Sequence, residues 1–243
     1  MENIDFNNML EVINIKKSFN GLKLLKDVSF SISQGSITSL FGENGSGKTT
    51  VSNILSGFVA PDSGKIIFND IDITRMNPVS ISKNGIGRVW QTPRIFRNLS
   101  ALENLMLASR NHPGEKSLNY FFRIKEIFRV ENVVRDKAVH IADQINLLSK
   151  VNETAGSFSF GEQKLLSIGM LLLNESTLLI LDEPFTGING KSVDHISEVL
   201  LNLRNIGKTI LIIEHNRTKA EKISNKIFNL VDGKIIQTEI MHS

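Results

Sequence analysis

The sequence predicts an α/β fold with a mostly parallel sheet, and three observations carry that prediction. Residues 178–181 form a short, continuous apolar run, which is typical of a strand buried on both faces. Strand-like and helix-like segments alternate toward both ends of the chain. A chain of 243 residues that is 41% hydrophobic is long enough to bury one large α/β core with a small inserted lobe.

The first third of the chain is rich in strands that are separated by turn residues. The turn signals are Gly35, a Pro-Asp-Ser-Gly sequence at 61–64 and an Asn-Gly pair at 84–85. We expect strands here at residues 10–19, 28–32, 37–41, 65–68 and 86–90 and a helix at 47–56. The fold prediction for this part of the chain includes an N-terminal antiparallel β subdomain.

The middle of the chain is helical in character. Ser100 and Glu103 have the spacing of a capping box, which predicts a helix that ends near residue 109. A long amphipathic stretch covers about residues 121–148. We therefore expect one domain in which residues 92–157 form a helical subdomain inserted into an α/β core of residues 1–91 and 158–243.

The last third returns to alternating helices and strands. Residues 161–174 are apolar on nearly every face, as in a buried helix, and lead into the expected strand at 178–181. Further strands are expected at 209–214, 227–231 and 234–238, with Asp232-Gly233 as the turn between the last two.

Composition narrows the classes of protein that this chain can represent. The net charge of +3 is small, and basic and acidic residues are interspersed, so nucleic-acid binding is not expected. The longest apolar candidate for a membrane span, residues 165–181, is interrupted by polar residues at 174–177, so no membrane insertion is expected. With no cysteine and no signal-peptide pattern at the start, we expect a cytoplasmic protein.

One glycine-rich segment predicts a nucleotide site. It follows the apolar residues 37–41 and fits the phosphate-loop pattern G-x-x-x-x-G-K-[ST] in full, with Gly42, Glu43, Asn44, Gly45, Ser46, Gly47, Lys48, Thr49 and Thr50. Its glycines let backbone N–H groups converge on phosphates, and the following helix presents its positive N-terminal end. Lys48 adds a charge for the outer phosphates, and the Thr49 hydroxyl suits Mg²⁺. We therefore expect ATP and Mg²⁺ as ligands.

Two adjacent carboxylates end a predicted buried strand. In that position Asp182 can hold Mg²⁺ together with Thr49, while Glu183 can polarise a water molecule for attack on the γ-phosphate. The pair therefore indicates metal-assisted hydrolysis of a nucleoside triphosphate.

Together with further motifs, the phosphate loop and the acid pair make the sequence resemble the ATPases of ABC transporters. The segment Ser159-Phe160-Gly161-Glu162-Gln163 is similar to that family's signature sequence, and residues 186–189 are similar to its D-loop, which ends at Asn189. The resemblance covers essentially the whole chain. It implies roles for Gln91 as a catalytic and metal-binding glutamine, His215 as a catalytic switch histidine and Phe19 as an adenine-stacking aromatic residue.

The same resemblance implies that the site is shared between two subunits. Lys48, Thr49, Gln91 and Asp182 would hold MgATP from one chain, while Ser159 and Gly161 of a second chain would complete the γ-phosphate site. The expected partners are a second copy or a homologous ATPase subunit, together with integral membrane permease subunits on the inner face of the cell membrane. Two departures stand out, because Phe160 replaces a glycine and Glu162 replaces the commoner glutamine.

Finer similarity points to the branched-chain amino acid importers of this family. It is carried by residues 89–104, 182–189 and 213–216. Close relatives of these importers serve urea and amide import or lipopolysaccharide export, so the cargo and direction stay open. A cytosolic ABC ATPase outside transport, for example in iron–sulfur assembly, is an alternative, and a nucleotide sensor without hydrolysis is disfavoured by Asp182 and Glu183.

Two other groups of residues have ordinary structural interpretations. The aromatic residues Tyr120, Phe121, Phe122 and Phe128 are expected to form the core of the helical lobe rather than a docking surface. No metal-ligand spacing is found for His112, His140, His195 and His242.

Overall fold

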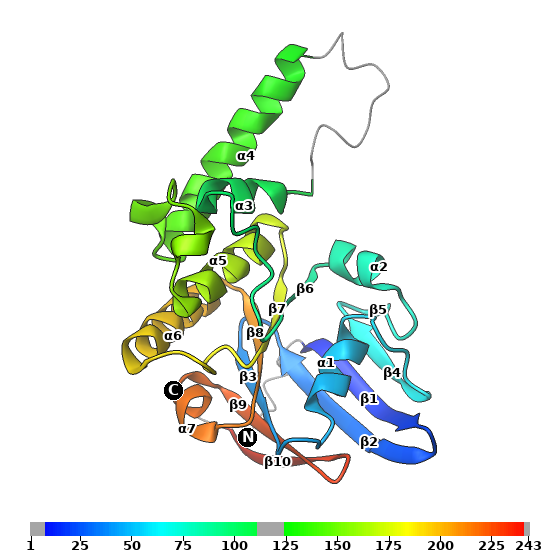
Figure 1. Cartoon of the computed structure of the whole chain (residues 1–243). Helices are drawn as coiled ribbons and strands as arrows, with labels where there is room; N and C mark the ends of the chain where they lie inside the picture. Colours follow the sequence, from blue (N-terminus) through cyan, green and yellow to red (C-terminus); the bar gives the residue numbers. More distant parts are fainter. Residues whose placement is uncertain (1–7, 111–123, 241–243) are drawn as a thin grey trace, which may run out of the picture. The chain divides into compact units, whose positions relative to one another are not determined.

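The computed structural model describes residues 8–110 and 124–240 of the chain. Strands and helices alternate along it, as Figure 1 shows. His112, Tyr120, Phe121, Phe122 and His242 lie outside the described residues. Within the described residues, no helix is both long enough and apolar enough to cross a membrane.

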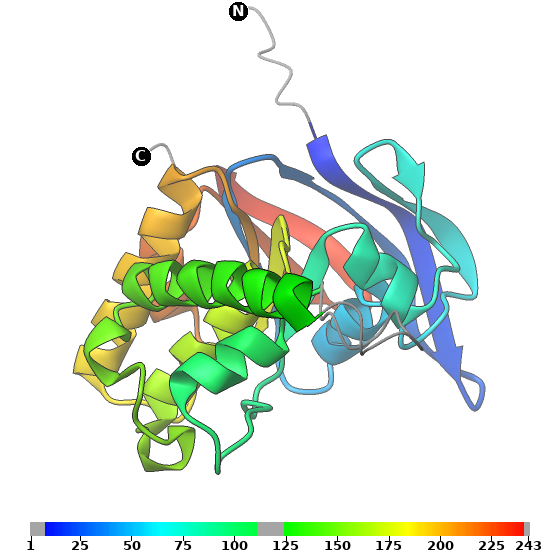
Figure 2. The same cartoon turned by 90° about the horizontal axis from the view of Figure 1, so that it is seen from above.

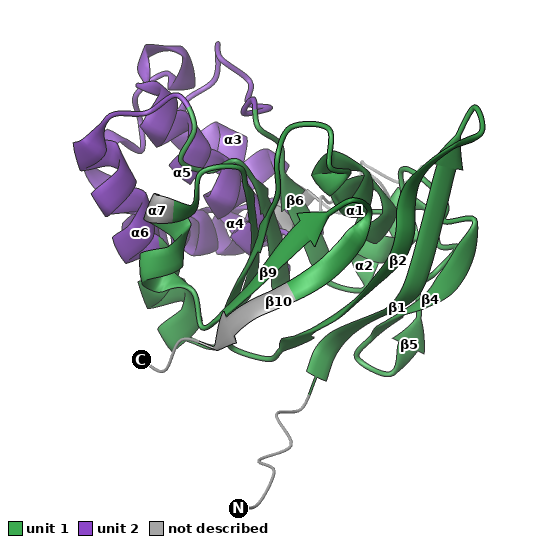
Figure 3. Ribbon diagram, turned by 90° about the horizontal axis from the view of Figure 1, so that it is seen from below, with its two compact units in different colours: residues 1–91, 177–186, 200–243 green, residues 92–176, 187–199 purple. Residues whose placement is uncertain are grey.

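The described chain falls into two compact units, which Figure 3 colours green and purple. The first unit contains residues 1–91, 177–186 and 200–243, and the second contains residues 92–176 and 187–199. The expected subdomain boundary at residues 92–157 stays a prediction. In the structure the helix that follows Ser159 belongs to the same unit as the helices before it, because they pack against one another.

The first unit is built on a sheet of ten strands in the order β5-β4-β1-β2-β10-β9-β3-β8-β7-β6. One part is antiparallel and comprises β1 (Asn8–Phe19), β2 (Leu22–Ser33), β4 (Ser63–Phe68) and β5 (Ile71–Asp72). The other part is mostly parallel and comprises β3 (Ile37–Phe41), β6 (Ile86–Val89), β7 (Leu178–Asp182), β8 (Thr209–Glu214), β9 (Lys226–Val231) and β10 (Lys234–Ile240). The fold prediction is confirmed, including the antiparallel N-terminal part.

The parallel strands bring their carboxyl ends to one level. Phe41 of β3 is opposite Glu214 of β8, and Asp182 of β7 is opposite Ile213. Val89 of β6 is opposite Leu181. Every residue of β3, β7 and β8 is buried, which explains the continuous apolar runs in the sequence. The residues that follow these strands therefore emerge along one edge of the sheet.

Among the described residues, three helices lie wholly within the first unit. They are α1 (Lys48–Leu55), α2 (Pro78–Lys83) and the short α7 (Arg217–Ala220), which is followed by a 3-10 turn at Glu221–Ile223. Val51, Ile54 and Leu55 of α1 join the apolar core of the sheet. Because α1 begins directly after the phosphate loop, this packing fixes the position of its N-terminus.

The second unit is helical and contains α3 (Ala101–Leu107), α4 (Ile124–Gln144), α5 (Phe160–Leu173) and the start of α6 (Gly190–Asn205). Two 3-10 turns, Leu148–Lys150 and Ala155–Ser157, join α4 to α5. The helices α3, α4 and α5 pack against one another (Figures 1 and 2). Gly169 allows this close approach, since an added Cβ would lie 2.6 Å from Ile145 and 2.9 Å from Leu105.

The core of this unit differs from the expectation at Phe128. Its side chain is 62% exposed, so the prediction that it belongs to the core of the lobe is wrong. The core contribution of α4 comes from later turns, through Ala138, Ile141 and Ala142. These residues lie at helical spacing on the last turns of α4, whereas Phe128 lies on its first turns.

Candidate functional site

The phosphate loop connects the end of β3 to the start of α1. Gly47 has a φ of 105°, which favours glycine, and it directly precedes the helix. Gly42 is required for a different reason, since a Cβ there would lie 2.7 Å from the carbonyl oxygen of Leu230. The loop therefore adopts a path that few other residues would permit.

Lys48 is held inside this loop. Its Nζ donates hydrogen bonds to the carbonyl oxygens of Gly42 at 2.7 Å and Glu43 at 2.8 Å. Burial lowers the pKa of Lys48, while the negative charges of Glu183 and Glu214 oppose that shift. The amino group is thus positioned within the curve of the loop.

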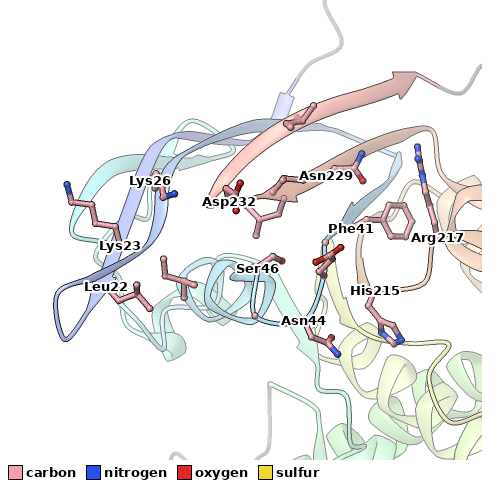
Figure 4. Close-up of a pocket in the computed structure, with 18 residues that line it drawn as sticks. Leu22, Lys23, Lys26, Phe41, Asn44, Ser46, His215, Arg217, Asn229 and Asp232 are labelled. Atoms are coloured by element: carbon pink, nitrogen blue, oxygen red, sulfur yellow. The ribbon is translucent and has the colours of Figure 1, made fainter.

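A cavity of about 670 Å³ opens beside the loop, and all its lining residues belong to the first unit. Figure 4 shows basic side chains along its rim, from Lys23 and Lys26 of β2 and from Arg217, with His215 near Asn44. Ser46 Oγ is buried and has no hydrogen-bond partner in the described part of the chain. A basic cavity with glycine backbone and an unpaired hydroxyl fits a polyphosphate.

Phe19 lies at the end of β1 and is not among the residues that line this cavity. Its ring is 45% exposed, and Lys17 Nζ is 5.3 Å from the ring centre. Its expected role in adenine stacking stays a prediction.

The two carboxylates at the end of β7 have different surroundings. Asp182 is buried, and its Oδ2 accepts a hydrogen bond from Arg88 Nε at 2.6 Å and forms an ion pair with Arg88 Nη2, also at 2.6 Å. Burial raises the pKa of Asp182, and the Arg88 charge opposes that shift. The other oxygen, Oδ1, is buried and accepts no hydrogen bond from the described residues.

Glu183 is held in a strained backbone conformation. Its φ is 47°, in the left-handed region that L-residues other than Asn, Asp and Gly seldom adopt, while its N–H donates to the Ile213 carbonyl at 2.8 Å. Gln91 Nε2 donates to Glu183 Oε2 at 2.7 Å, and His215 Nδ1 lies 3.5 Å from Oε1. The expected base, glutamine and switch histidine are therefore adjacent.

Glu214 is a further buried acid at this edge. Its side chain accepts a hydrogen bond from the Phe185 N–H at 2.9 Å and lies 3.8 Å from His215 Nδ1. Burial raises the pKa of Glu214. Because Glu214 accepts the hydrogen bond from Phe185, its side chain holds the backbone that follows Glu183 in place.

The residues present fit a magnesium ion accompanied by phosphate. In the described ranges, no group of three or more His, Cys, Asp and Glu side chains could hold a metal without further ligands. The unpaired Oδ1 of Asp182 is an oxygen ligand of the type that Mg²⁺ prefers, and Thr49 is exposed at the start of α1. A metal here would share Asp182, Thr49, Gln91 and phosphate oxygens.

The signature segment lies in the second unit and starts α5. Ser159 is the N-cap, and its N–H and Oγ both donate to Glu162 Oε2 at 2.8 Å. Lys150 Nζ donates to the other oxygen, Oε1, at 2.7 Å. The carboxylate of Glu162 thus faces its own helix start and a lysine, so its charge is compensated within the unit.

Phe160 and Gly161 pack against the loop that precedes α6. The Phe160 ring would lie 3.2 Å from a Cβ at Gly187, and a Cβ on Gly161 would lie 2.9 Å from Ser192 Cβ. Asn189 Oδ1 accepts a hydrogen bond from the Ser192 N–H at 2.9 Å and so caps α6. Gln163 is buried, where its Nε2 donates to the Phe158 carbonyl at 2.9 Å.

The expected site residues therefore form two groups. The phosphate loop, Gln91, Asp182, Glu183 and His215 meet in the first unit, which also contains Phe19, although Phe19 does not line the cavity. The second unit contains the remaining residues, Ser159, Gly161, Glu162, Gln163 and Asn189. Sequence reasoning missed the contacts of Arg88, Glu214 and Lys150. A signal existed for Arg88, because a charge inside the apolar run at residues 86–90 needs a partner.

This fold and this edge of the sheet define a phosphate-loop protein with an acid pair beside the loop. Residues 25–186 match the family described as ABC transporter, and the chain belongs to that family. The resemblance inferred from the motifs is confirmed.

Known relatives agree with this assignment. The chain is 35% identical to the "Probable branched-chain amino acid transport ATP-binding protein LivG" of Methanocaldococcus jannaschii, covering 94% of this chain and 88% of that protein. It is 31% identical to the high-affinity branched-chain amino acid transport ATP-binding protein BraF of Pseudomonas aeruginosa, covering 93% and 89%. The ADP conformation of an ATP-binding cassette of an ABC transporter superposes with a TM-score of 0.82 at 34% identity, covering 94% and 89%.

Proposed function

We propose that this chain binds and hydrolyses ATP with Mg²⁺ and so powers an ABC transporter. The observation that carries the proposal is the meeting of the phosphate loop, Asp182, Glu183, Gln91 and His215 at one edge of the sheet. The cassette of similar fold and 34% identity in its ADP conformation supports a nucleotide as ligand.

The residues of the first unit divide the chemistry between them. The loop N–H groups and Lys48 bind the β- and γ-phosphates, which requires Lys48 Nζ to exchange its carbonyl partners for phosphate oxygens. Thr49, Gln91 and Asp182 would hold Mg²⁺, which when bound neutralises charge on the phosphates. Glu183 accepts a proton from the attacking water, and His215 stabilises the transferring phosphoryl group.

The second unit serves a neighbouring subunit in this proposal. Ser159 and the Gly161 backbone of one chain complete the γ-phosphate site of another, either an identical copy or a homologous ATPase. Closure of this dimer over two ATP molecules permits hydrolysis, and release of products reopens it. The movement is transmitted to membrane permease subunits, so the chain is peripheral on the cytoplasmic face.

The cargo is proposed from the relatives. LivG of Methanocaldococcus jannaschii and BraF of Pseudomonas aeruginosa carry names that refer to branched-chain amino acid transport, at 35% and 31% identity. We therefore propose import of branched-chain amino acids or related small polar solutes. Affinity purification of this chain from native membranes should recover an integral permease, whereas recovery of iron–sulfur assembly proteins instead would contradict a transport role.

The catalytic assignment is tested at Glu183. Glu183→Gln protein should bind ATP and dimerise with it, while phosphate release falls by about 10²–10⁴-fold because the general base is lost. Glu198→Gln, an exposed position on α6, is the matched control and should retain the full rate. Hydrolysis by the Glu183→Gln protein at the unmodified rate would show that another group is the base.

A further inference from the structure

We infer that Arg88 is a positioning residue for the metal site, which holds Asp182 by one oxygen and leaves the other oxygen for the metal. This inference rests on the proposed function. It assigns a role to a residue of β6 that lies outside the phosphate loop and the acid pair.

The guanidinium of Arg88 makes an unusual contact with Asp182. In the common forked pair, two nitrogens of an arginine contact two different oxygens of a carboxylate. Here Nε and Nη2 both contact Oδ2, at 2.6 Å each. The side chain of Arg88 is only 4% exposed, so water screens this interaction little. The two carboxylate oxygens are therefore unequal.

As a consequence, the buried carboxylate of Asp182 has its charge compensated by Arg88 at one oxygen, and its other oxygen remains available to a metal ion. A buried carboxylate is costly unless a cation compensates its charge, and Arg88 supplies that cation. The compensation does not occupy Oδ1, which is buried and has no hydrogen-bond partner in the described residues. An oxygen held in this way is ready to accept a cation or a water bound to it.

Arg88 also links the carboxylate to the helix that begins with the phosphate-binding residues. Nη1 donates to Asn53 Oδ1 at 2.7 Å and to Ser56 Oγ at 3.0 Å; Asn53 lies on α1, and Ser56 is the C-cap of that helix. Since Thr49 is the second residue of α1, the same guanidinium sets the position of Thr49 and Asp182 relative to each other. Two of the three proposed protein ligands, Thr49 and Asp182, therefore depend on one side chain.

The ring of Trp90 packs against this guanidinium. The carbon Cζ of Arg88 lies 3.8 Å from the centre of the Trp90 ring, and this ring also packs edge-on against Phe58, with 5.2 Å between the ring centres. Trp90 immediately precedes Gln91, the third proposed ligand. Lysine could not replace this arrangement, because it has a point charge and no planar fork.

The test compares Arg88→Lys with Arg75→Lys, a change at an exposed arginine of the same unit. Mn²⁺ binding is measured from the free-ion signal in electron paramagnetic resonance with ATP no more than equimolar to the protein, and the Mn²⁺ bound by ATP alone is subtracted by a protein-free titration. Arg88→Lys should weaken Mn²⁺ affinity by about 10–100-fold, the usual effect of losing a residue that supports a metal ligand. Its affinity for ATP without metal should change by less than about twofold, because the loop binds phosphates through its own N–H groups and Lys48. The Arg75→Lys protein should match the unmodified chain.

A second variant keeps the test decisive if Arg88→Lys does not fold. Asn53→Ala removes an anchor of the guanidinium without touching Asp182, and it should weaken Mn²⁺ binding by about threefold or more, since hydrogen bonds to charged groups are strong. Trp90 is the only tryptophan of the chain, so its emission shows directly whether the stacked guanidinium has moved. If Arg88→Lys fails to fold, Asn53→Ala decides the matter.

The outcomes separate the two proposals. If the unmodified chain with ATP does not bind Mn²⁺, the proposed function fails and the inference falls with it. If the unmodified chain binds Mn²⁺ and both variants bind it equally well, Arg88 has no positioning role and the proposed function stands. Weaker Mn²⁺ binding with intact metal-free ATP binding supports the inference.

Discussion

Two helices of the second unit begin with the same four-residue arrangement. The helix α3 follows Ser100 with Glu103 three residues later, and α5 follows Ser159 with Glu162 three residues later. Both starts are complete capping boxes, with Oγ-to-Oε2 distances of 2.8 Å in each. Judged by local chemistry alone, the two helix starts are equivalent.

Their surroundings are different. Glu103 is exposed; its carboxylate accepts hydrogen bonds from the N–H and Oγ of Ser100, and its own N–H donates to Ser100 Oγ. Glu162 also accepts a hydrogen bond from Lys150, and the residues beside it pack against Gly187 and Ser192. A capping box therefore explains how a helix begins, while the neighbours of Ser159 indicate why this start belongs to a proposed site.

The largest expected difference concerns hydrolysis. Ser159→Ala should lower the rate of phosphate release about 10²-fold, the usual effect of removing one hydrogen-bond donor to a transition-state oxygen. Ser100→Ala removes the same cap from a helix with no proposed contact to nucleotide, so its rate should stay near that of the unmodified chain. Both rates are measured at saturating ATP and Mg²⁺.

Ser159→Thr is the control for this comparison, because threonine keeps both the hydroxyl and the capping hydrogen bond. It should retain most of the activity that Ser159→Ala loses. Equal rates of phosphate release for the Ser159→Ala and Ser100→Ala proteins would contradict a role of Ser159 in hydrolysis. Ser159 would then serve only as the cap of α5.

A smaller effect is expected on folding stability, and here the two starts should agree. Each alanine variant loses one capping side chain, so each should lower the free energy of unfolding by about 1 kcal/mol. Urea unfolding followed by circular dichroism measures both. A loss at Ser159 that clearly exceeds the loss at Ser100 would mean that the contacts of Phe160 and Lys150 depend on the cap.

The sequence predicted those elements whose signal is local. Strands β3 and β8 have the expected bounds because both are buried throughout and bounded by turn or loop residues. The helix α6 was not predicted, because Asn189 was interpreted as a site residue and its second property, capping a helix, was overlooked. The strand β2 begins at Leu22 rather than at residue 28, since residues 22–25 also pair with β1.

The same limit applies to the candidate site. The phosphate loop is one continuous segment of the sequence, and so is the acid pair, so each can be predicted from a local pattern. The register of the parallel strands then brings the two segments to one edge of the sheet. Arg88 binds Asp182, which is 94 residues away, and Asn53, which is 35 residues away. No local pattern encodes such a pairing, because it arises from the order of strands in the sheet.

The smallest expected difference between the two helix starts is their response to pH. Hydrogen bonds from the Ser100 backbone and hydroxyl hold the pKa of Glu103 below its ordinary value of 4.5. For Glu162, burial acts in the opposite direction, but the hydrogen bonds from Lys150 and Ser159 outweigh it and the pKa is also lowered. A lowered pKa in the folded state contributes stability that is present above pH 4.5 and is lost as the pH falls through the folded-state value.

Lys150→Met separates the two carboxylates. Removing the lysine should raise the pKa of Glu162 toward 4.5, so that the stability it contributes is smaller and is lost at higher pH, while Glu103 keeps its own window. The measurement is the difference in urea midpoint between each parent and its Glu162→Gln or Glu103→Gln derivative, followed from pH 7 downward. If Lys150→Met shifts both windows or neither, Lys150 does not act on Glu162 specifically, and the two helix starts are electrostatically alike.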